Sequence, residues 1–549
     1  MAARAADHAP AESAGADSTR ELAPGGSRGE DLDVLVVGAG PTGLLAACEL
    51  LRRDVRVRII DQAPEPSTAS KAISIYPRVL DIFEDLGVLD GIVRSSIRLS
   101  RLSYFADFRP LASFEVPIDS AARSLPQHET ERMLADRLHE LGGKVERGTG
   151  LLRLEDVESA AGTHGATALL THHDGVVERV RARYVVGADG AGSTVRAQIG
   201  GDFAGTTYEM AFALIDAYVE GPLRPDEILY YQSAAGTLLI VPMPGGVYRF
   251  VSVLPTAAGD EVTVPMMQAI VDERGPDGVT IREPVWQAVF RVHARIAAAF
   301  RRGPVFLIGD AAHVHSPAGG QGMNNGLQDA HNLAWKLAAV IHGESPASLL
   351  STYASERTAA TRRIIRDTDL QTRAWMVKGR GKVLLRNALF RLLARSGWAS
   401  RVYAPRLAGR RLTYAPTRKT QQPAGWSSWS SLCRLRNRRP GGLRVGTPFP
   451  RRLATGYGIA GPAAEPGEWT IVTADAARVA PWIAQVEAMA EHWPRLRVIG
   501  IPRADMAPVA RCRRPGFYLI RPDGHIAAHG HVRDLPRLET ELRAMLNPR

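Results

Sequence analysis

The stretch Asp33-Val-Leu-Val-Val-Gly38-Ala-Gly40-Pro-Thr-Gly43, followed by the largely apolar run 44–53, decides how the N-terminal part of the chain folds. Its first five residues have the pattern of a buried strand, and the run after the glycines has the pattern of a helix. In such a unit Gly38 permits the tight turn, Gly40 lets the backbone approach a pyrophosphate, and Gly43 lets helix and strand pack closely. The segment therefore predicts a dinucleotide-binding fold, with the helix N-terminus facing the phosphates.

A second strand is predicted over residues 55–60, and it ends at Asp61. This carboxylate follows the glycines by about twenty residues, where it can accept hydrogen bonds from a ribose hydroxyl. Strand, glycine turn, helix, second strand and terminal acid together support the dinucleotide prediction more strongly than the glycines alone. They do not distinguish one dinucleotide from another.

Two later segments repeat the combination of strand, carboxylate and glycine turn. Residues 184–190 end in Asp189-Gly190, and residues 305–326 place Asp310 between a strand and a glycine-rich loop that opens a helix. A carboxylate at a strand end can bond a sugar-like hydroxyl, and a helix start presents free N–H groups and a positive dipole end. Such an end suits a reduced, anionic flavin ring.

These three motifs resemble those of the class A flavoprotein monooxygenases, the aromatic hydroxylase family that includes p-hydroxybenzoate, phenol and polyketide hydroxylases. The resemblance covers most of the chain. It implies FAD bound lengthwise, with the pyrophosphate at the first motif, the adenosine ribose at Asp61, the ribitol at Asp310, and the ring beside Pro317. The residues that the resemblance assigns to cofactor binding are Gly38, Gly40, Pro41, Gly43, Asp61, Lys71, Gln127, Asp189, Asp310, Gly320, Gly322, Met323 and Asn324.

The sequence departs from the family pattern at one of these positions, and the family implies particular roles for others. Lys71 stands near where the family often carries an arginine, and it keeps the charge but lacks the planar fork of a guanidinium. The family implies contact of Gln127 with the flavin side chain, and associates Asp189 with both FAD and NADPH binding. No catalytic side chain is assigned, because the cofactor carries the chemistry. The place of His313 and His315 before the glycine loop favours a backbone-shaping or packing role over a catalytic pair, and neither histidine is assigned a role in the site.

The resemblance also implies a reaction. NADPH or NADH would reduce FAD and leave, and O2 would then form a flavin hydroperoxide that transfers one oxygen atom to an aromatic ring. The implied substrate is a small phenolic or polyketide-like molecule, as in secondary metabolism. The same scaffold permits Baeyer–Villiger oxidation, epoxidation or double-bond reduction, and a flavin-binding protein without turnover is a further alternative.

Residues 203–293 are predicted to form a β-sheet that roofs the substrate pocket. Its strands are expected at 210–219, 228–232, 237–241 and 247–254. Four side chains in this region could face the substrate, although ordinary strand packing explains them as well. They are Tyr231, Gln232, Met243 and Arg249.

Composition limits the other possibilities. The 549 residues are 45% hydrophobic and 23% charged, as is typical of globular proteins. The net charge of +11 comes from scattered arginines without interleaved aromatics, so no nucleic-acid partner is predicted. The three cysteines form no CxxC pair, which argues against a disulfide scaffold or zinc site and agrees with a cytoplasmic location. No apolar run is long enough to insert stably in a membrane.

The predicted fold class is α/β: a Rossmann-like FAD-binding domain with an inserted antiparallel β-sheet substrate domain and a small thioredoxin-like C-terminal domain. The tail lacks CxxC, so a structural or oligomerisation role, such as homodimer formation, is expected for it. A basic amphipathic helix at 382–395 is expected to dock its apolar side on the flavin domain rather than on a membrane. The predicted boundaries are a disordered leader 1–30, FAD-binding parts 31–202 and 294–417, the substrate sheet 203–293, a linker 418–452 and the tail 453–549.

Overall fold

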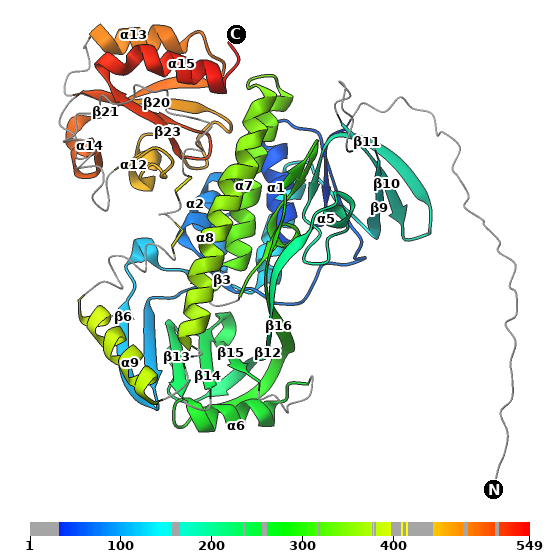
Figure 1. Cartoon of the computed structure of the whole chain (residues 1–549), viewed down its shortest axis with the longest axis vertical. Coiled ribbons are helices and arrows are strands. Elements are labelled where there is room, and N and C mark those ends of the chain that lie inside the picture. Colours follow the sequence, from blue (N-terminus) through cyan, green and yellow to red (C-terminus); the bar gives the residue numbers. More distant parts are fainter. Residues whose placement is uncertain are drawn as a thin grey trace, which may run out of the picture.

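The structure is a computed structural model that describes residues 32–155, 157, 165–233, 236–254, 261–316, 319–375, 377, 380–396, 408–409, 413–414, 443–475, 481–510 and 515–548. The predictions for the leader, for most of the linker and for Pro317 lie outside the described residues. Figure 1 shows a central α/β unit, an antiparallel sheet below it and a smaller α/β unit at the C-terminal end above it.

The central unit is built on a mainly parallel sheet, as the first motif predicted. The path β17-β18-β11-β1-β2-β8 carries two further antiparallel strands, β10 on β11 and β9 on β10. Because helices cover the sheet, β1 is buried after its first residue and is apolar except for Asp33, which pairs with Arg56. The strands are β1 Leu32–Val37, β2 Val57–Asp61, β8 Val145–Arg147, β9 Thr149–Glu155, β10 Ala166–His172, β11 Val177–Gly187, β17 Arg301–Arg302 and β18 Val305–Leu307.

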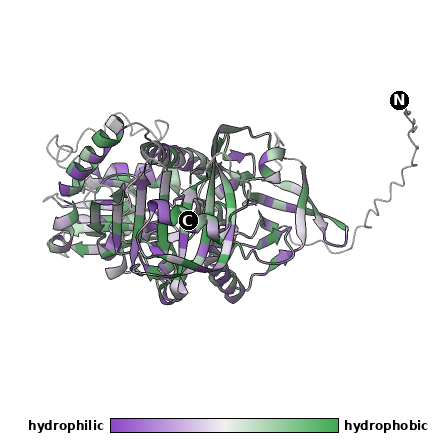
Figure 2. Cartoon of the chain, turned by 90° about the horizontal axis from the view of Figure 1, so that it is seen from below, coloured by the Kyte–Doolittle hydropathy of each residue, from purple (hydrophilic) through white to green (hydrophobic). Residues whose placement is uncertain are grey.

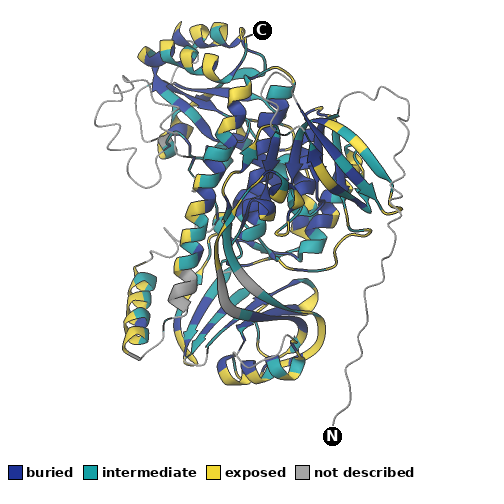
Figure 3. Ribbon diagram, turned by 45° about the vertical axis from the view of Figure 1, so that its right-hand side comes forward, coloured by how far each residue is buried: buried dark blue, intermediate teal, exposed yellow. Residues whose placement is uncertain are grey.

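Two buried helices, α1 (Pro41–Leu51) and α7 (Gly322–Ile341), pack against each other over this sheet. Figure 3 shows how buried residues gather where the helices meet the central strands. The helices α2 Pro77–Leu86, α3 Leu89–Ser95, α4 Gln127–Glu140 and α5 Thr194–Gln198 complete this unit, with the short strands β3 Ser74–Ile75, β4 Ile97–Arg98 and β7 Arg123–Ser124.

The second sheet has the order β19-β16-β12-β15-β14-β13-β5-β6 and is antiparallel except where β13 meets β5. All four strands predicted within 203–293 are present. The sheet has four strands more than these: a long strand at 280–297 lies beside β12, a hairpin from the first part of the chain adds two strands, and the segment after Asp310 adds a short one. Helix α6 (Val264–Arg274) packs on it. The strands are β5 Arg101–Ala106, β6 Arg109–Glu115, β12 Phe203–Glu220, β13 Glu227–Ser233, β14 Gly236–Pro242, β15 Val247–Val253, β16 Thr280–Ala297 and β19 His313–Val314.

Helices α8 (Ser351–Trp375) and α9 (Arg380–Arg395) follow α7. The expected docking of α9 on the flavin domain is wrong. Its Phe390 packs against Tyr104 of β5, with ring centroids 4.7 Å apart, so the helix lies on the edge of the antiparallel sheet. Its most apolar face is exposed and carries Leu384, Leu385, Leu389 and Leu392. The aromatic contact, and not the leucine stripe, fixes the docking face.

The C-terminal unit has a four-stranded sheet in the order β21-β20-β22-β23, with only β20 and β21 parallel. The sequence predicts strands at 468–475 and 495–501, a helix at 479–492 and a hairpin with a Pro-Asp-Gly turn at 517–527, and the structure has elements at each of these places. The likeness to thioredoxin stays a prediction. Figure 2 shows hydrophobic and hydrophilic residues alternating along many strands and helices of the chain. The elements are α12 Arg451–Gly456, β20 Trp469–Asp475, α13 Pro481–Ala490, β21 Leu496–Pro502, α14 Arg503–Ala510, β22 Gly516–Ile520, β23 Ile526–His531 and α15 Leu535–Met545.

None of the helices in the described part of the chain is long and apolar enough to cross a membrane.

Candidate functional site

The first glycine turn has the geometry of a phosphate cradle. Gly38 has φ +101°, and a Cβ on Gly43 would lie 2.0 Å from the Gly38 carbonyl oxygen, so both positions require glycine for the protein's own packing. Gly40 differs, because a Cβ there would meet no protein atom within 4 Å. The space beside Gly40 is therefore open to a ligand at the start of α1, where helix N–H groups point outward.

Asp61 ends β2 beside this turn. Its Oδ2 accepts a hydrogen bond from the Ala39 backbone N–H at 2.7 Å, and its Oδ1 accepts one from Ala63 at 2.8 Å. The carboxylate thus ties the glycine turn to the second strand. Because each oxygen has a further lone pair, the predicted contact with a ribose hydroxyl is compatible with this geometry and stays a prediction.

Asp189 follows β11 and shapes its own turn. Its carboxylate accepts hydrogen bonds from the Ser193 hydroxyl at 2.5 Å and from the Val195 N–H at 3.0 Å, at the start of α5. The neighbouring Gly190 has φ +77° and lines the main cavity. The side chain therefore holds the turn, whereas the glycine presents its backbone to the cavity.

A cavity of about 480 Å³ lies between the glycine turns and the antiparallel sheet. Its two walls differ in kind. The cofactor wall is formed by backbone turns and polar groups: Gly40, Pro41, Thr42, Lys71, Gln127, Gly190, Asp310, His315, Gly320, Gly322 and Met323. The substrate wall comes mainly from the antiparallel sheet and is largely apolar: Ile73, Phe212, Leu214, Ile228, Tyr230, Tyr231, Leu239, Val241, Val251 and Phe290.

Asp310 lies on the cofactor wall, and its carboxylate faces the cavity. The side chain is accessible to solvent through this cavity, although protein surrounds the cavity itself. Removal from bulk water raises the pKa of this carboxyl, and the charges of His313 and Lys71 only partly oppose that effect. Its position between a strand end and the glycine loop matches the predicted contact with a ribitol hydroxyl. Among the described residues, no hydrogen bond to the Asp310 carboxylate competes with such a ligand.

Lys71 is presented to the cavity by a segment that two other side chains hold. Gln127 accepts a hydrogen bond from the Ala72 N–H at 3.1 Å. Arg249, from β15, donates to the carbonyl oxygens of Lys71, at 3.0 Å, and of Ser70. Gln127 and Arg249 therefore position the lysine-bearing backbone, and this role of Arg249 was not anticipated from the sequence.

The buried Arg249 is itself paired with Asp216 of β12. Two parallel hydrogen bonds of 2.7 Å join the guanidinium to the carboxylate, and both side chains are less than 5% exposed. A bidentate pair of this kind fixes the orientation of both groups. Arg249 therefore connects the antiparallel sheet to the cofactor wall.

The glycine-rich loop is clamped by Asn324 and Tyr76. The Asn324 amide donates to the carbonyl oxygens of Ser74 at 2.7 Å and Gly320 at 3.0 Å, and accepts from the Tyr76 N–H at 2.8 Å. The Tyr76 hydroxyl donates to the Gly319 carbonyl at 2.6 Å. Asn324, predicted as a cofactor ligand, thus holds the loop, while Gly320 and its neighbours reach the cavity.

The two histidines of this region have different surroundings. His313 is buried and its Nε2 lies 2.6 Å from Oδ2 of Asp329, which supports the predicted packing role. His315 lines the cavity, and burial lowers its pKa to about 4, so the ring is neutral at ordinary pH. Its Nδ1 lies 3.0 Å from the Ser316 carbonyl oxygen, which assigns the ring proton to Nδ1.

Of the side chains proposed to face substrate, three line the cavity: Tyr231, Gln232 and Arg249. The fourth does not, because Met243 packs in a small cluster with Ile73 and Leu99. Tyr230 was missed. Its ring stacks on Tyr104, with centroids 4.8 Å apart, and burial raises its pKa to about 12.

The fold and this cavity define an α/β protein with the glycine turn of a dinucleotide-binding fold and a separate sheet opposite the cofactor wall. A family model described as "FAD binding domain" matches residues 31–368. The chain belongs to this family.

Several proteins similar to this chain are named as monooxygenases or hydroxylases. A 6-methylpretetramide 4-monooxygenase of Streptomyces rimosus is 38% identical over 365 residues, 65% of this chain and 63% of that protein. A pentachlorophenol 4-monooxygenase of Sphingobium chlorophenolicum is 36% identical over 373 residues, 65% of this chain and 67% of that protein. The solved anhydrotetracycline hydroxylase OxyS from Streptomyces rimosus superposes with a TM-score of 0.70 at 27% identity, covering 95% of this chain and 100% of that one.

The predicted family, the α/β fold class and FAD as cofactor are thereby confirmed. The chain is an enzyme of the FAD-dependent monooxygenase, aromatic hydroxylase type. The roles assigned to individual cofactor-binding residues stay predictions.

Proposed function

We propose that the protein is an FAD- and NAD(P)H-dependent monooxygenase that inserts one oxygen atom from O2 into a phenolic or polyketide-like aromatic molecule. The observation that carries the proposal is the two-walled cavity, in which an open glycine turn and Asp310 face a largely apolar sheet. The relatives act, by their names, on pretetramide, chlorinated phenol and tetracycline skeletons.

The residues of the cofactor wall fit FAD. The space beside Gly40 would accept the pyrophosphate, Asp310 would accept a hydrogen bond from the ribitol, and Lys71 would supply positive charge beside the cofactor. When bound, FAD supplies the redox chemistry that activates O2. The protein contributes binding, orientation and charge.

The substrate wall would bind a flat, electron-rich ring system. Phe212 and Phe290 stack at 5.5 Å, and with the leucine and valine side chains they exclude water from the reacting atoms. The phenol of Tyr230 stays protonated because of its raised pKa, so it would donate or accept a hydrogen bond that orients a substrate hydroxyl. The cavity of about 480 Å³ spans both walls, so it would hold part of the cofactor together with the substrate.

Labelled molecular oxygen tests this proposal. Purified enzyme with NADPH and isotopically labelled O2 is incubated with a panel of phenols and tetracyclic polyketides, and the products are weighed by mass spectrometry. A product that carries one labelled oxygen atom is expected. A product that gains only hydrogen, or label that enters only from water, would contradict the proposal.

Two further expectations belong to this proposal. A cytoplasmic location agrees with the cysteine usage, and a homodimer would give the C-terminal unit an oligomerisation role. Fractionation and light scattering of the purified holoenzyme would test them.

A further inference from the structure

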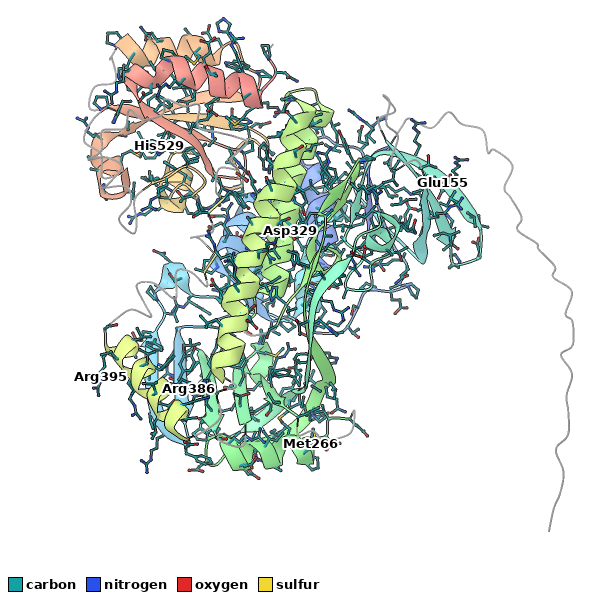
Figure 4. All side chains as sticks on the ribbon, in the orientation of Figure 1. Glu155, Met266, Asp329, Arg386, Arg395 and His529 are labelled. Carbon is teal, nitrogen blue, oxygen red and sulfur yellow. The ribbon has the colours of Figure 1, made fainter. Side chains whose placement is uncertain are left out.

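A row of buried polar side chains runs along α7. Asn325, Asp329, Asn332 and Lys336 are spaced by four, three and four residues, so they share one face of the helix. All four are at most 1% exposed. Helix α7 begins at Gly322 on the cavity wall, and Figure 4 places Asp329 at the middle of the molecule. The row therefore leads from the cofactor wall toward the C-terminal unit.

At the cavity end, Asp329 holds the turn that carries Asp310. Its Oδ2 accepts hydrogen bonds from the Gly309 N–H at 3.0 Å and from His313 at 2.6 Å. Its Oδ1 accepts one from Nε of Arg357 at 2.6 Å. Because Gly309 directly precedes Asp310, a shift of the Asp329 carboxylate would move the predicted cofactor ligand.

At the other end, the turn of the β22–β23 hairpin enters the row. Arg521 donates to both oxygens of Glu356 on α8, at 2.6 and 3.0 Å, and Lys336 donates to the same carboxylate at 2.8 Å. Arg521 also pairs with Asp523, which lies 3.4 Å from the Asn332 amide. The hairpin turn of the C-terminal unit is therefore fixed to α7 and α8 by buried charges.

Tyr414 connects the two ends. Its hydroxyl accepts a hydrogen bond from Nη1 of Arg357 at 3.1 Å, and its ring lies 4.3 Å from that of His525 in the hairpin. Its backbone N–H donates to Gly446, whose own N–H donates to Ile526 of β23. Tyr414 is thus held by the C-terminal unit while its hydroxyl satisfies a fully buried guanidinium of the flavin domain.

We propose that the C-terminal unit positions the FAD site through Tyr414, Arg357 and Asp329, with the hairpin turn Arg521–His525 as its anchor. Loss of the Tyr414 hydroxyl would leave a buried Arg357 donor unsatisfied. Arg357 and Asp329 would then readjust, and the Gly309–Asp310 turn would move with them. These are positioning residues and touch neither cofactor nor substrate. The inference rests on the FAD site of the proposed function, but not on the identity of the substrate.

The test is Tyr414→Phe, which keeps the ring and removes only the hydroxyl. The dissociation constant of FAD is measured by fluorescence titration of the apo form of the full-length protein, and the visible spectrum of the bound flavin is recorded. We expect the constant to rise about three- to tenfold and the flavin spectrum to shift. Arg521→Met, which releases Glu356, is expected to act in the same direction.

Tyr457→Phe is the matched control. Its hydroxyl bonds Asp505 within the C-terminal unit, so its loss should leave the FAD constant and the spectrum unchanged. Folded Tyr414→Phe and Arg521→Met proteins with the wild-type constant and spectrum would overturn the inference, even if their melting temperatures fell. A wild-type protein that binds no FAD would overturn the proposed function as well.

Discussion

The two walls of the cavity are built in different ways. The cofactor wall presents mainly backbone: Gly40 leaves space for a ligand, while Gly38 and Gly43 behind it permit close packing, and Asn324 holds the glycine-rich loop through carbonyl and N–H groups. On the substrate wall, side chains from strands distant in sequence form an apolar surface. A backbone site tolerates few residue types, whereas a side-chain surface can be changed one residue at a time. We therefore expect cofactor binding to depend mainly on the backbone of the fold, and the choice of substrate to depend on the side chains of the sheet.

The largest expected effect on stability comes from removing Arg249, which links the antiparallel sheet to the cofactor wall. Arg249→Met leaves Asp216 as a buried, unpaired carboxylate and releases the carbonyl oxygens of Ser70 and Lys71. We expect the free energy of unfolding, measured by urea titration, to fall by about 3–5 kcal/mol. Adding Asp216→Asn should restore part of it, because the unpaired charge is removed.

The exposed Arg224 gives the matched control for that experiment, since it pairs with Asp226 on the surface. Arg224→Met should cost at most about 1 kcal/mol. Equal losses for Arg249→Met and Arg224→Met would show that the buried pair does not hold the walls together.

Two glycines of the first glycine turn, Gly43 and Gly40, should respond in opposite ways. Gly43→Ala would place Cβ 2.0 Å from a backbone oxygen, so we expect stability to fall by about 3 kcal/mol. Gly40→Ala meets no protein atom, so stability should change by less than about 1 kcal/mol. Its Cβ would instead occupy ligand space and weaken FAD binding by at least about tenfold. Urea titration and FAD titration of both variants separate these effects, and a stable Gly43→Ala protein would refute the packing role.

Asp310→Ala should weaken FAD binding by about tenfold or more, because a hydroxyl loses a charged acceptor. The effect should depend on pH. Binding favours the ionised carboxylate, and burial raises the pKa of Asp310, so wild-type affinity should fall on acidification earlier than an ordinary aspartate would allow. The variant should lack this component. If the dissociation constant of FAD depends on pH in the same way in the wild type and in the variant, Asp310 does not contact the cofactor.

The smallest expected effect lies on the substrate wall. Tyr230→Phe keeps the ring on Tyr104 and removes one hydroxyl, so KM for a phenolic substrate should rise about two- to tenfold while the FAD constant stays unchanged. Tyr218, exposed on β12, provides the control substitution Tyr218→Phe. A change in FAD affinity with an unchanged KM would place Tyr230 on the cofactor wall instead.

The same contrast explains what the sequence could predict. Gly38, Gly43 and Asp310 lie in contiguous motifs whose local geometry determines their roles, so their positions could be recognised. Arg249 and Tyr230 reach the cavity only through strand pairing across many residues, which no local pattern encodes. For the same reason the sequence left open whether Met243 faces the substrate or packs in the sheet, and the structure shows packing. The exposed leucines of α9 show that an apolar helix face need not be the one that docks.

The sequence of α7 also contains a pattern of polar residues that was not used in the prediction of the fold. Asn325, Asp329, Asn332 and Lys336 recur at helical spacing in a helix whose other residues are mostly apolar in its second half, and this spacing predicts a polar stripe on one face. The partners of that stripe, Glu356, Arg357 and the β22–β23 turn, follow only from the tertiary fold. Sequence could therefore have indicated that α7 contacts something polar, but not that the C-terminal unit supplies it.

The central claim is that FAD held in this cavity is reduced by NAD(P)H and reoxidised by O2 beside an aromatic substrate. The most direct measurement is anaerobic stopped-flow reduction of the yellow holoenzyme by NADPH, with and without phenols and tetracyclic polyketides, followed by admission of air and mass spectrometry. The account predicts that one class of substrate accelerates bleaching of the flavin and yields a product heavier by one oxygen atom. Flavin that NADPH does not reduce with any of these compounds, or a product that gains only hydrogen, would contradict it.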